Sequence, residues 1–162
     1  TVKLVDKAKN FKDTKKHWAK DSIDFVSARG LMNGKSSTAF APEAKITRAR
    51  LWTILARWED VDLTGGKKWY SKARAWAKNQ GISDGSRPNA AITMLWRAQG
   101  KPAAEQETAF KDVSSDEYYA QAVAWAKEKG IAQANSKGRF NPDAACTRAE
   151  IAAFLYRMSL SE

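Results

Sequence analysis

The chain repeats its own sequence, and this constrains its fold more than any other feature. A shift of 100 positions places glycine, phenylalanine, proline and a Thr-Arg-Ala triplet on residues of the same kind. The matched pairs are Gly30 and Gly130, Phe40 and Phe140, Pro42 and Pro142, and Thr47-Arg48-Ala49 and Thr147-Arg148-Ala149. A middle copy matches Trp69 to Trp18 and Gly81 to Gly30. We therefore predict one module over residues 1–162, built of three repeats near 8–58, 60–100 and 107–159, because short repeats bury their apolar faces only against one another.

Each copy has the pattern of a helix, a loop and a second helix. Apolar residues recur at helical spacing up to Gly30 and Gly130, which are typical left-handed helix ends. Thr47 and Thr147 precede the second apolar stripe as helix caps, and Glu150 completes a capping box with Thr147. Arg50 takes the glutamate's position in the first copy. Since no strand-like alternation competes, we predict an all-α fold.

Composition indicates a globular domain, whose excess of basic residues either keeps its surface soluble, which composition alone favours, or attracts an anionic partner. Of 162 residues, 43% are apolar and 28% are charged, and no apolar run is long enough to cross a membrane. The net charge of +10 is uneven, because residues 1–57 carry 13 Lys/Arg against 5 Asp/Glu and residues 103–162 carry 7 against 9. A basic N-terminal part would attract nucleic acid, anionic lipid or an acidic polysaccharide. The start at Thr1 without a charged-then-apolar leader suggests a fragment or a mature product.

The sequence offers few residues that could support catalysis or metal binding. The single cysteine, Cys146, excludes an internal disulfide, and together with the single histidine, His17, it is too little for a zinc site or a catalytic triad. No isolated pair of carboxylates of the kind used by wall-degrading enzymes stands out. We therefore expect no catalytic residue, no metal and no cofactor.

The ordered motifs resemble those of the S-layer homology family. They include Phe11-x-Asp13, His17-Trp18-Ala19, Gly30-Leu31-Met32-Asn33-Gly34, Phe40-x-Pro42, Ile46-Thr47-Arg48-Ala49, Gly81-Ile82-Ser83-Asp84-Gly85 and Thr147-Arg148-Ala149-Glu150. The resemblance implies a pseudo-threefold helical module that is extracellular, in the cell wall or S-layer. It also implies an anchor that holds an attached parent protein to cell-wall polysaccharide, often pyruvylated, through grooves between neighbouring repeats.

The second and third copies depart from this pattern. Ile92 to Arg97 spans five positions, where Ile46 to Arg57 and Cys146 to Arg157 span eleven. The alignment of the copies places Thr93 on Thr47, and the six missing residues fall where the Arg-Ala-Glu turn should be. Either this copy is degenerate or the chain is joined across missing residues, and the return of Leu95-Trp96-Arg97 in register favours the join. Ala134 replaces the second loop glycine of the third copy.

Two arginines are the first candidate ligand-binding residues. Arg48 and Arg148 each follow a helix cap, where the positive end of the helix dipole disfavours a cation unless an anion also comes there. A guanidinium can bind a carboxylate through two parallel hydrogen bonds. The alternative is a structural pairing with Asp13 or Asp112, and the residues alone leave both open, while the resemblance favours ligand contact. We expect Arg48 to contribute more than Arg148, because the first copy is basic and has the Asn33-Gly34 loop.

Aromatic, glycine and aspartate residues complete the candidate set. Trp18 and Trp69 begin equivalent helices and could stack on a sugar ring, although Trp18 is also expected to anchor its helix, and the other tryptophans are expected in the core. Loop residues that offer main-chain amides to a ligand are Gly30, Met32, Asn33, Gly34, Ser83, Asp84 and Gly85. For Asp13 and Asp112 we expect caps on the following helices, with direct sugar contact as the alternative.

These features predict a non-catalytic carbohydrate-binding anchor for acidic cell-wall polysaccharide, without membrane insertion. The alternative is a basic nucleic-acid-binding domain, which the charge and interleaved aromatics would suit. The acidic third copy and the lack of one basic stripe on a helix weigh against nucleic acid as a partner.

Overall fold

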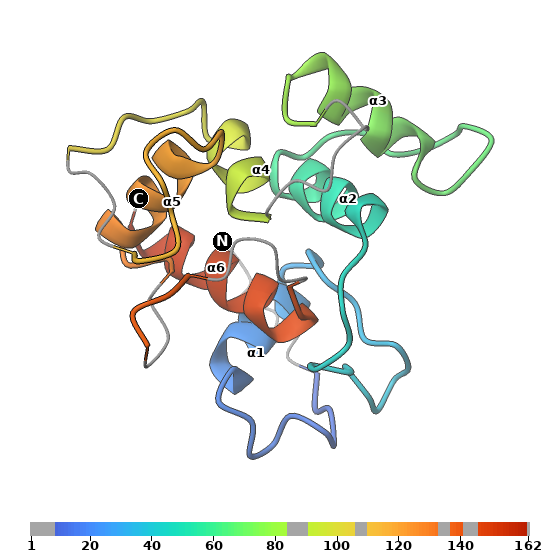
Figure 1. Ribbon diagram of the computed structural model, residues 1–162. Coiled ribbons are helices and arrows are strands. Elements are labelled where there is room, and N and C mark those ends of the chain that lie inside the picture. The colour runs from blue at the N-terminus through green and yellow to red at the C-terminus, as the bar shows by residue number, and fades with distance from the viewer. Residues whose placement is uncertain (1–8, 84–90, 106–109, 133–136, 141–145, 162) are drawn as a thin grey trace, which may run out of the picture.

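The computed structural model describes residues 9–83, 91–105, 110–132, 137–140 and 146–161. These residues form six helices and one isolated bridge, between Lys45 and Thr147. The helices are α1 (Lys20–Ala28), α2 (Arg48–Trp58), α3 (Ser71–Asn79), α4 (Ala91–Ala98), α5 (Ala120–Glu128) and α6 (Arg148–Leu160), as Figure 1 shows. The all-α prediction is confirmed. None of the described helices has the length and apolar character that a membrane crossing requires.

The odd-numbered helices end in the same way. Each has nine residues and is followed, after one intervening residue, by a glycine with φ of 68° to 70°. These glycines are Gly30, Gly81 and Gly130. A residue in the left-handed conformation at this point ends the helix. Glycine adopts this conformation with little steric strain because it has no Cβ. The amide of the next residue then donates to a carbonyl of the last turn, as in Leu31 to Val26 at 2.9 Å. The predicted stops are confirmed.

Threonine caps begin two of the even-numbered helices as expected. The Thr47 hydroxyl accepts a hydrogen bond from the amide of Arg50 at 3.3 Å. Thr147 accepts one from the amide of Glu150 at 3.1 Å, and the Glu150 carboxylate accepts one from the amide of Thr147 at 3.2 Å. The third copy therefore has the full capping box, while the first has its hydroxyl half.

The expected correspondence of Thr93 with the cap residue Thr47 is wrong. Thr93 lies inside α4 with its side chain fully buried, so it does not cap that helix. A shared contact gives the correct register: Arg57, Arg97 and Arg157 donate to the carbonyls of Leu31, Ile82 and Ile131 at 3.3, 3.1 and 3.1 Å. In this register Thr93 corresponds to Thr53. The interval from glycine to arginine is 16 positions in the middle copy and 27 in the others, so the shortening lies mainly before α4.

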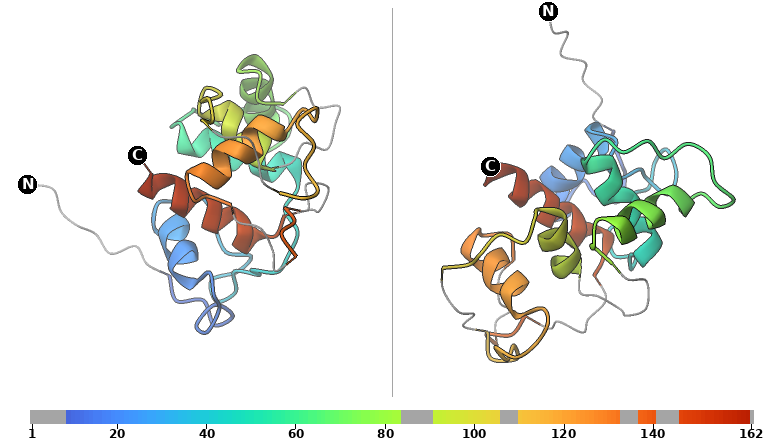
Figure 2. Two further views of the ribbon diagram at one scale, coloured as in Figure 1. Left: turned by 60° about the vertical axis from the view of Figure 1, so that its left-hand side comes forward. Right: turned by 90° about the horizontal axis from the view of Figure 1, so that it is seen from above.

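The helices pack in pairs that join different copies. α1 packs on α6, α2 on α3, and α4 on α5. Figures 1 and 2 show α1 alongside α6 in every view, although these helices lie at opposite ends of the sequence. Each first helix is thus covered by the second helix of another copy.

The core contains the apolar stripes that the sequence predicts. The buried residues include Leu51, Ile54 and Leu55 in α2, and Ile151, Phe154, Leu155 and Met158 in α6. Trp52 and Trp125 are buried, and Trp58, Trp76 and Trp96 pack partly buried against this core, which confirms their predicted role. Burial raises the pKa of the Cys146 thiol to about 12.

Truncation tests this interlocked packing. A chain of residues 1–100 lacks α5 and α6, which leaves α1 and α4 without their partner helices. We expect low helicity and no cooperative thermal transition, because the apolar faces of α1 and α4 would be exposed to water. Circular dichroism against the full chain measures this. A sharp melt with full helicity would contradict it.

Candidate functional site

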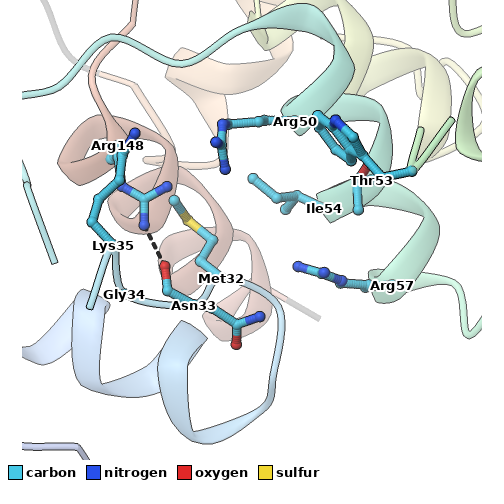
Figure 3. A pocket seen from close by; sticks show the side chains of 10 residues that line it. Met32, Asn33, Gly34, Lys35, Arg50, Thr53, Ile54, Arg57 and Arg148 are labelled. Atoms are coloured by element: carbon cyan, nitrogen blue, oxygen red, sulfur yellow. Dashed lines mark hydrogen bonds between the residues drawn. The ribbon is translucent and has the colours of Figure 1, made fainter. Parts of the chain in front are cut away.

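A polar pocket of about 350 Å³ lies where four parts of the chain meet. The loop after α1, one side of α2, the residue two before α3, and the first residue of α6 contribute to it. Its lining comprises Met32, Asn33, Gly34, Lys35, Arg50, Thr53, Ile54, Arg57, Trp69 and Arg148, of which Figure 3 labels nine. The ligand-binding candidates predicted from the sequence include Met32, Asn33, Gly34, Trp69 and Arg148, and the structure brings these five together.

Arg148 is fixed in this pocket by main-chain carbonyls. Its Nε donates to the carbonyl of Phe40 at 3.0 Å, and its Nη2 donates to that of Asn33. The guanidinium also lies 4.5 Å from the centroid of the Phe40 ring. The residue is only 4% exposed. Arg148 therefore joins the start of α6 to a loop more than a hundred positions earlier in the sequence.

The start of α6 is held by the same part of the first copy. The amides of Arg148 and Ala149 donate to the carbonyls of Ala44 and Pro42, each at 2.9 Å. These bonds satisfy first-turn amides that a helix leaves without intrahelical partners. The geometry explains how a cation is tolerated at the positive end of a helix: carbonyl oxygens surround its guanidinium.

The buried position of Arg148 affects the pKa of its guanidinium. Burial and the nearby charge of Arg50 lower the pKa of Arg148, and the charge of Asp13 opposes that change. An arginine still remains charged at neutral pH. The expected structural pairing with Asp13 thus acts through space, while the hydrogen bonds that hold Arg148 come from carbonyls.

Asp13 and Asp112 clamp loops instead of capping helices, so that expectation is wrong. The two carboxylate oxygens of Asp13 accept hydrogen bonds from the amides of Phe40 and Ala41 at 2.9 and 2.8 Å. Asp112 accepts one from the amide of Phe140 at 2.8 Å. The helices α1 and α5 begin seven and eight residues later, too far along the chain for a cap. Ala41 has a φ of 58°, so the Asp13 clamp stabilises a left-handed turn.

The two candidate tryptophans are exposed. Trp69 is 60% exposed and lines the pocket, where the Arg50 guanidinium lies 5.7 Å from its ring centroid. Trp18 is 63% exposed, and its ring lies 5.5 Å from that of His17. A side chain that is mostly exposed cannot anchor a helix by burial, so the expectation that Trp18 anchors the start of α1 is wrong. Tyr118 occupies the equivalent position two residues before α5 and is 43% exposed. This shared spacing could have identified Tyr118 as a third aromatic candidate from the sequence.

The glycine loop of the first copy has a packing role. A Cβ at Gly34 would come within 2.4 Å of Phe11 Cε1 and 2.6 Å of the Ser36 carbonyl oxygen. Glycine is therefore required here to leave room for Phe11, independently of any ligand. The side chain of Met32 is buried at the pocket edge. In the second copy Ser83 is buried, whereas Asp84 and Gly85 lie outside the described residues, as does Ala134.

Sequence reasoning missed three cations of the pocket. Lys35, Arg50 and Arg57 join Arg148 in its lining, and no carboxylate does so among the described residues. Burial lowers the pKa of Arg57. Arg48 is exposed and is not part of this lining. The Asn33-Gly34 loop that we grouped with Arg48 contacts Arg148, because helix packing brings the third copy onto the first. In the described part of the chain, no group of three or more His, Cys, Asp or Glu side chains could hold a metal ion.

The matches to known proteins identify the family of this chain. The S-layer homology domain model matches residues 10–49 and 109–152, together more than half of the 162 residues. The chain belongs to the S-layer homology domain family. The matched segments fall in the first and third expected copies. S-layer homology domains anchor cell-surface proteins to the cell wall, which confirms the predicted family and location.

Several relatives contain a similar segment. The chain is 30% identical over 174 residues to an amylopullulanase of Thermoanaerobacterium thermosulfurigenes, a match that covers 91% of this chain and 9% of the relative. It is 29% identical over 179 residues to exoglucanase XynX of Acetivibrio thermocellus, covering 94% and 16%. It is 24% identical over 161 residues to an S-layer protein of Bacillus thuringiensis subsp. finitimus, covering 86% and 20%.

This coverage separates the domain from the activities in those names. The chain spans a fifth or less of each of these relatives. The S-layer homology domain is a wall-anchoring module and is not catalytic, so the enzyme names describe other parts of much longer proteins.

The Asp13 clamp gives the domain an acid-sensitive element. Burial by itself would raise the pKa of Asp13, but the amides of Phe40 and Ala41 outweigh it and lower that pKa. Ionised Asp13 therefore stabilises the folded domain above its unfolded pKa of about 3.9, and this stabilisation is lost as the pH falls through the lower folded pKa.

We expect Asp13→Asn to reduce the melting temperature near neutral pH and to flatten its decline in acid, because a neutral amide cannot accept both bonds as strongly. Thermal melts at several pH values measure this. Asp116→Asn, at another exposed aspartate, serves as the control. Parallel curves for the wild-type and Asp13→Asn domains would contradict the prediction.

The buried position of Arg148 predicts a stability difference between the two equivalent arginines. Arg148→Ala leaves the carbonyls of Phe40 and Asn33 without their donor, so we expect a loss of about 2–3 kcal/mol in the free energy of unfolding. Arg48→Ala removes an exposed side chain and should cost about 0.5 kcal/mol or less. Urea denaturation of both variants measures this. Equal losses would show that the carbonyl contacts contribute little.

Proposed function

We propose that this domain retains its parent protein on the cell wall by binding an acidic polysaccharide, such as a pyruvylated glycan, in the pocket at Arg148. The observation that carries the proposal is the pocket's composition: Lys35, Arg50, Arg57 and Arg148, together with exposed Trp69, and no carboxylate among the described lining residues. A guanidinium favours a carboxylate partner, and an indole face favours the apolar face of a sugar ring.

The size of the pocket supports a sugar unit as the ligand. A volume of about 350 Å³ falls within the range of roughly 300–1,000 Å³ that small-molecule sites occupy. A nucleic acid would instead need a continuous basic surface to follow its backbone. Positive charge confined to a cavity favours a small acidic ligand over a long polyphosphate chain.

The proposal includes a pseudo-threefold arrangement of three repeats with a groove at each junction. Support comes from the three equivalent arginine-to-carbonyl contacts and the three inter-copy helix pairs. Trp18, Trp69 and Tyr118 each stand two residues before a first helix, where they could serve equivalent grooves. We assign Trp18 and Arg48 to such further grooves.

Retention on purified wall polysaccharide tests this function. Removal of acidic substituents from the polymer should reduce affinity at least about tenfold, because the pocket cations lose their charged partner. Trp69→Ala should weaken binding to the intact polymer about two- to tenfold without changing the melting temperature, because the ring is exposed. Co-sedimentation and calorimetric titration give both values.

Controls separate this function from its alternatives. Leu160→Ala removes an equally exposed apolar side chain outside the pocket and should bind like the wild type. Trp18→Ala shows whether a further groove contributes. Equal binding to intact and stripped polymer would contradict the proposal, and tighter binding to duplex DNA would favour the nucleic-acid alternative.

A further inference from the structure

The pocket contains one position where charge is reversed between copies. Arg50 occupies the place in α2 that Glu150 occupies in α6, because each donates its amide to the preceding cap threonine. In α6 the glutamate side chain turns back to the amide of Thr147. In α2 the equivalent side chain is a cation that lines the pocket.

The Arg50 side chain is held with its charge toward Arg148. Its guanidinium lies 5.7 Å from the Trp69 ring centroid, within the range of a cation–π contact. Figure 3 shows Arg50 and Arg148 reaching into the pocket from different helices and pointing toward one another. The charge of Arg50 lowers the pKa of Arg148, so the two cations repel each other. An anion placed between them would relieve this repulsion.

We propose that Arg50 sets the charge of the ligand, so that this pocket selects a sugar carrying two negative charges over a sugar carrying one. Arg148 binds the first charge and Arg50 the second, with Lys35 nearby to add to the positive field. A phosphate monoester or two neighbouring carboxylates would both provide such a dianionic group. This inference rests on the proposed function, because it specifies the ligand of the same pocket.

Calorimetric titration with small defined glycosides tests the inference. The probes are methyl glycosides of one amino sugar that carries a single pyruvate ketal, a single phosphate monoester, or a ketal together with a 3-O-lactyl carboxylate. The wild-type domain should bind at least one of the doubly charged probes at least about tenfold more tightly than the ketal probe. A preference for only one of them identifies which dianionic group the pocket accepts.

The variant Arg50→Gln separates charge recognition from folding. Glutamine is also a capping-box residue, so this change removes the cation while allowing the bond back to Thr47. We expect an unchanged or raised melting temperature, loss of the preference for doubly charged probes, and a much smaller weakening of the ketal probe than of the doubly charged probes. Arg74→Gln, at an exposed arginine of α3 outside the pocket, is the matched control and should retain the preference.

Different results would contradict the inference and the proposed function. Equal affinity of the wild-type domain for singly and doubly charged probes would refute the inference and leave the proposed function intact. Equal weakening of all probes by Arg50→Gln would do the same, since Arg50 would then add only general attraction. Failure of every acidic probe to bind the wild-type domain would contradict the proposed function itself.

Discussion

The junction at Arg148 is the interaction on which the rest of the structure depends. Its guanidinium donates to the carbonyls of Phe40 and Asn33 and lies against the Phe40 ring, while the first amides of α6 donate to Pro42 and Ala44. A buried cation would be costly without such partners. Because these bonds join the third copy to the first, they fix α6 beside α1 and bring the two ends of the sequence together.

The pocket follows from that junction. Once the loop that carries Asn33 is fixed against Arg148, the neighbouring side of α2 presents Arg50 and Arg57 to the same space, and Trp69 stands at its edge. Lys35 adds a fourth cation from the loop. The contacts that stabilise the fold therefore also concentrate positive charge in one cavity. The structural role of Arg148 is therefore compatible with its proposed ligand-binding role.

The segment expected to be the middle copy shares two features with the flanking copies. It has 11 fewer residues than the others between its helix-ending glycine and its second-helix arginine. Arg97 still donates to the Ile82 carbonyl at 3.1 Å, and Ile92, Met94 and Leu95 are buried. α4 still packs against α5. The shortened segment thus keeps the arginine contact and one apolar helix face.

The sequence by itself determined the local structure, namely the helix ends at Gly30 and Gly130, the caps at Thr47 and Thr147, the apolar stripes and the family. These features depend on residues a few positions apart, whose chemistry acts within one turn or one helix. The partners of Asp13 and Arg148, the packing role of Gly34 and the membership of Lys35, Arg50 and Arg57 in one pocket were decided only by tertiary structure. Arg148 and Asn33 are 115 positions apart, and no spacing rule links them. They meet because each first helix buries its apolar face on the second helix of a different copy.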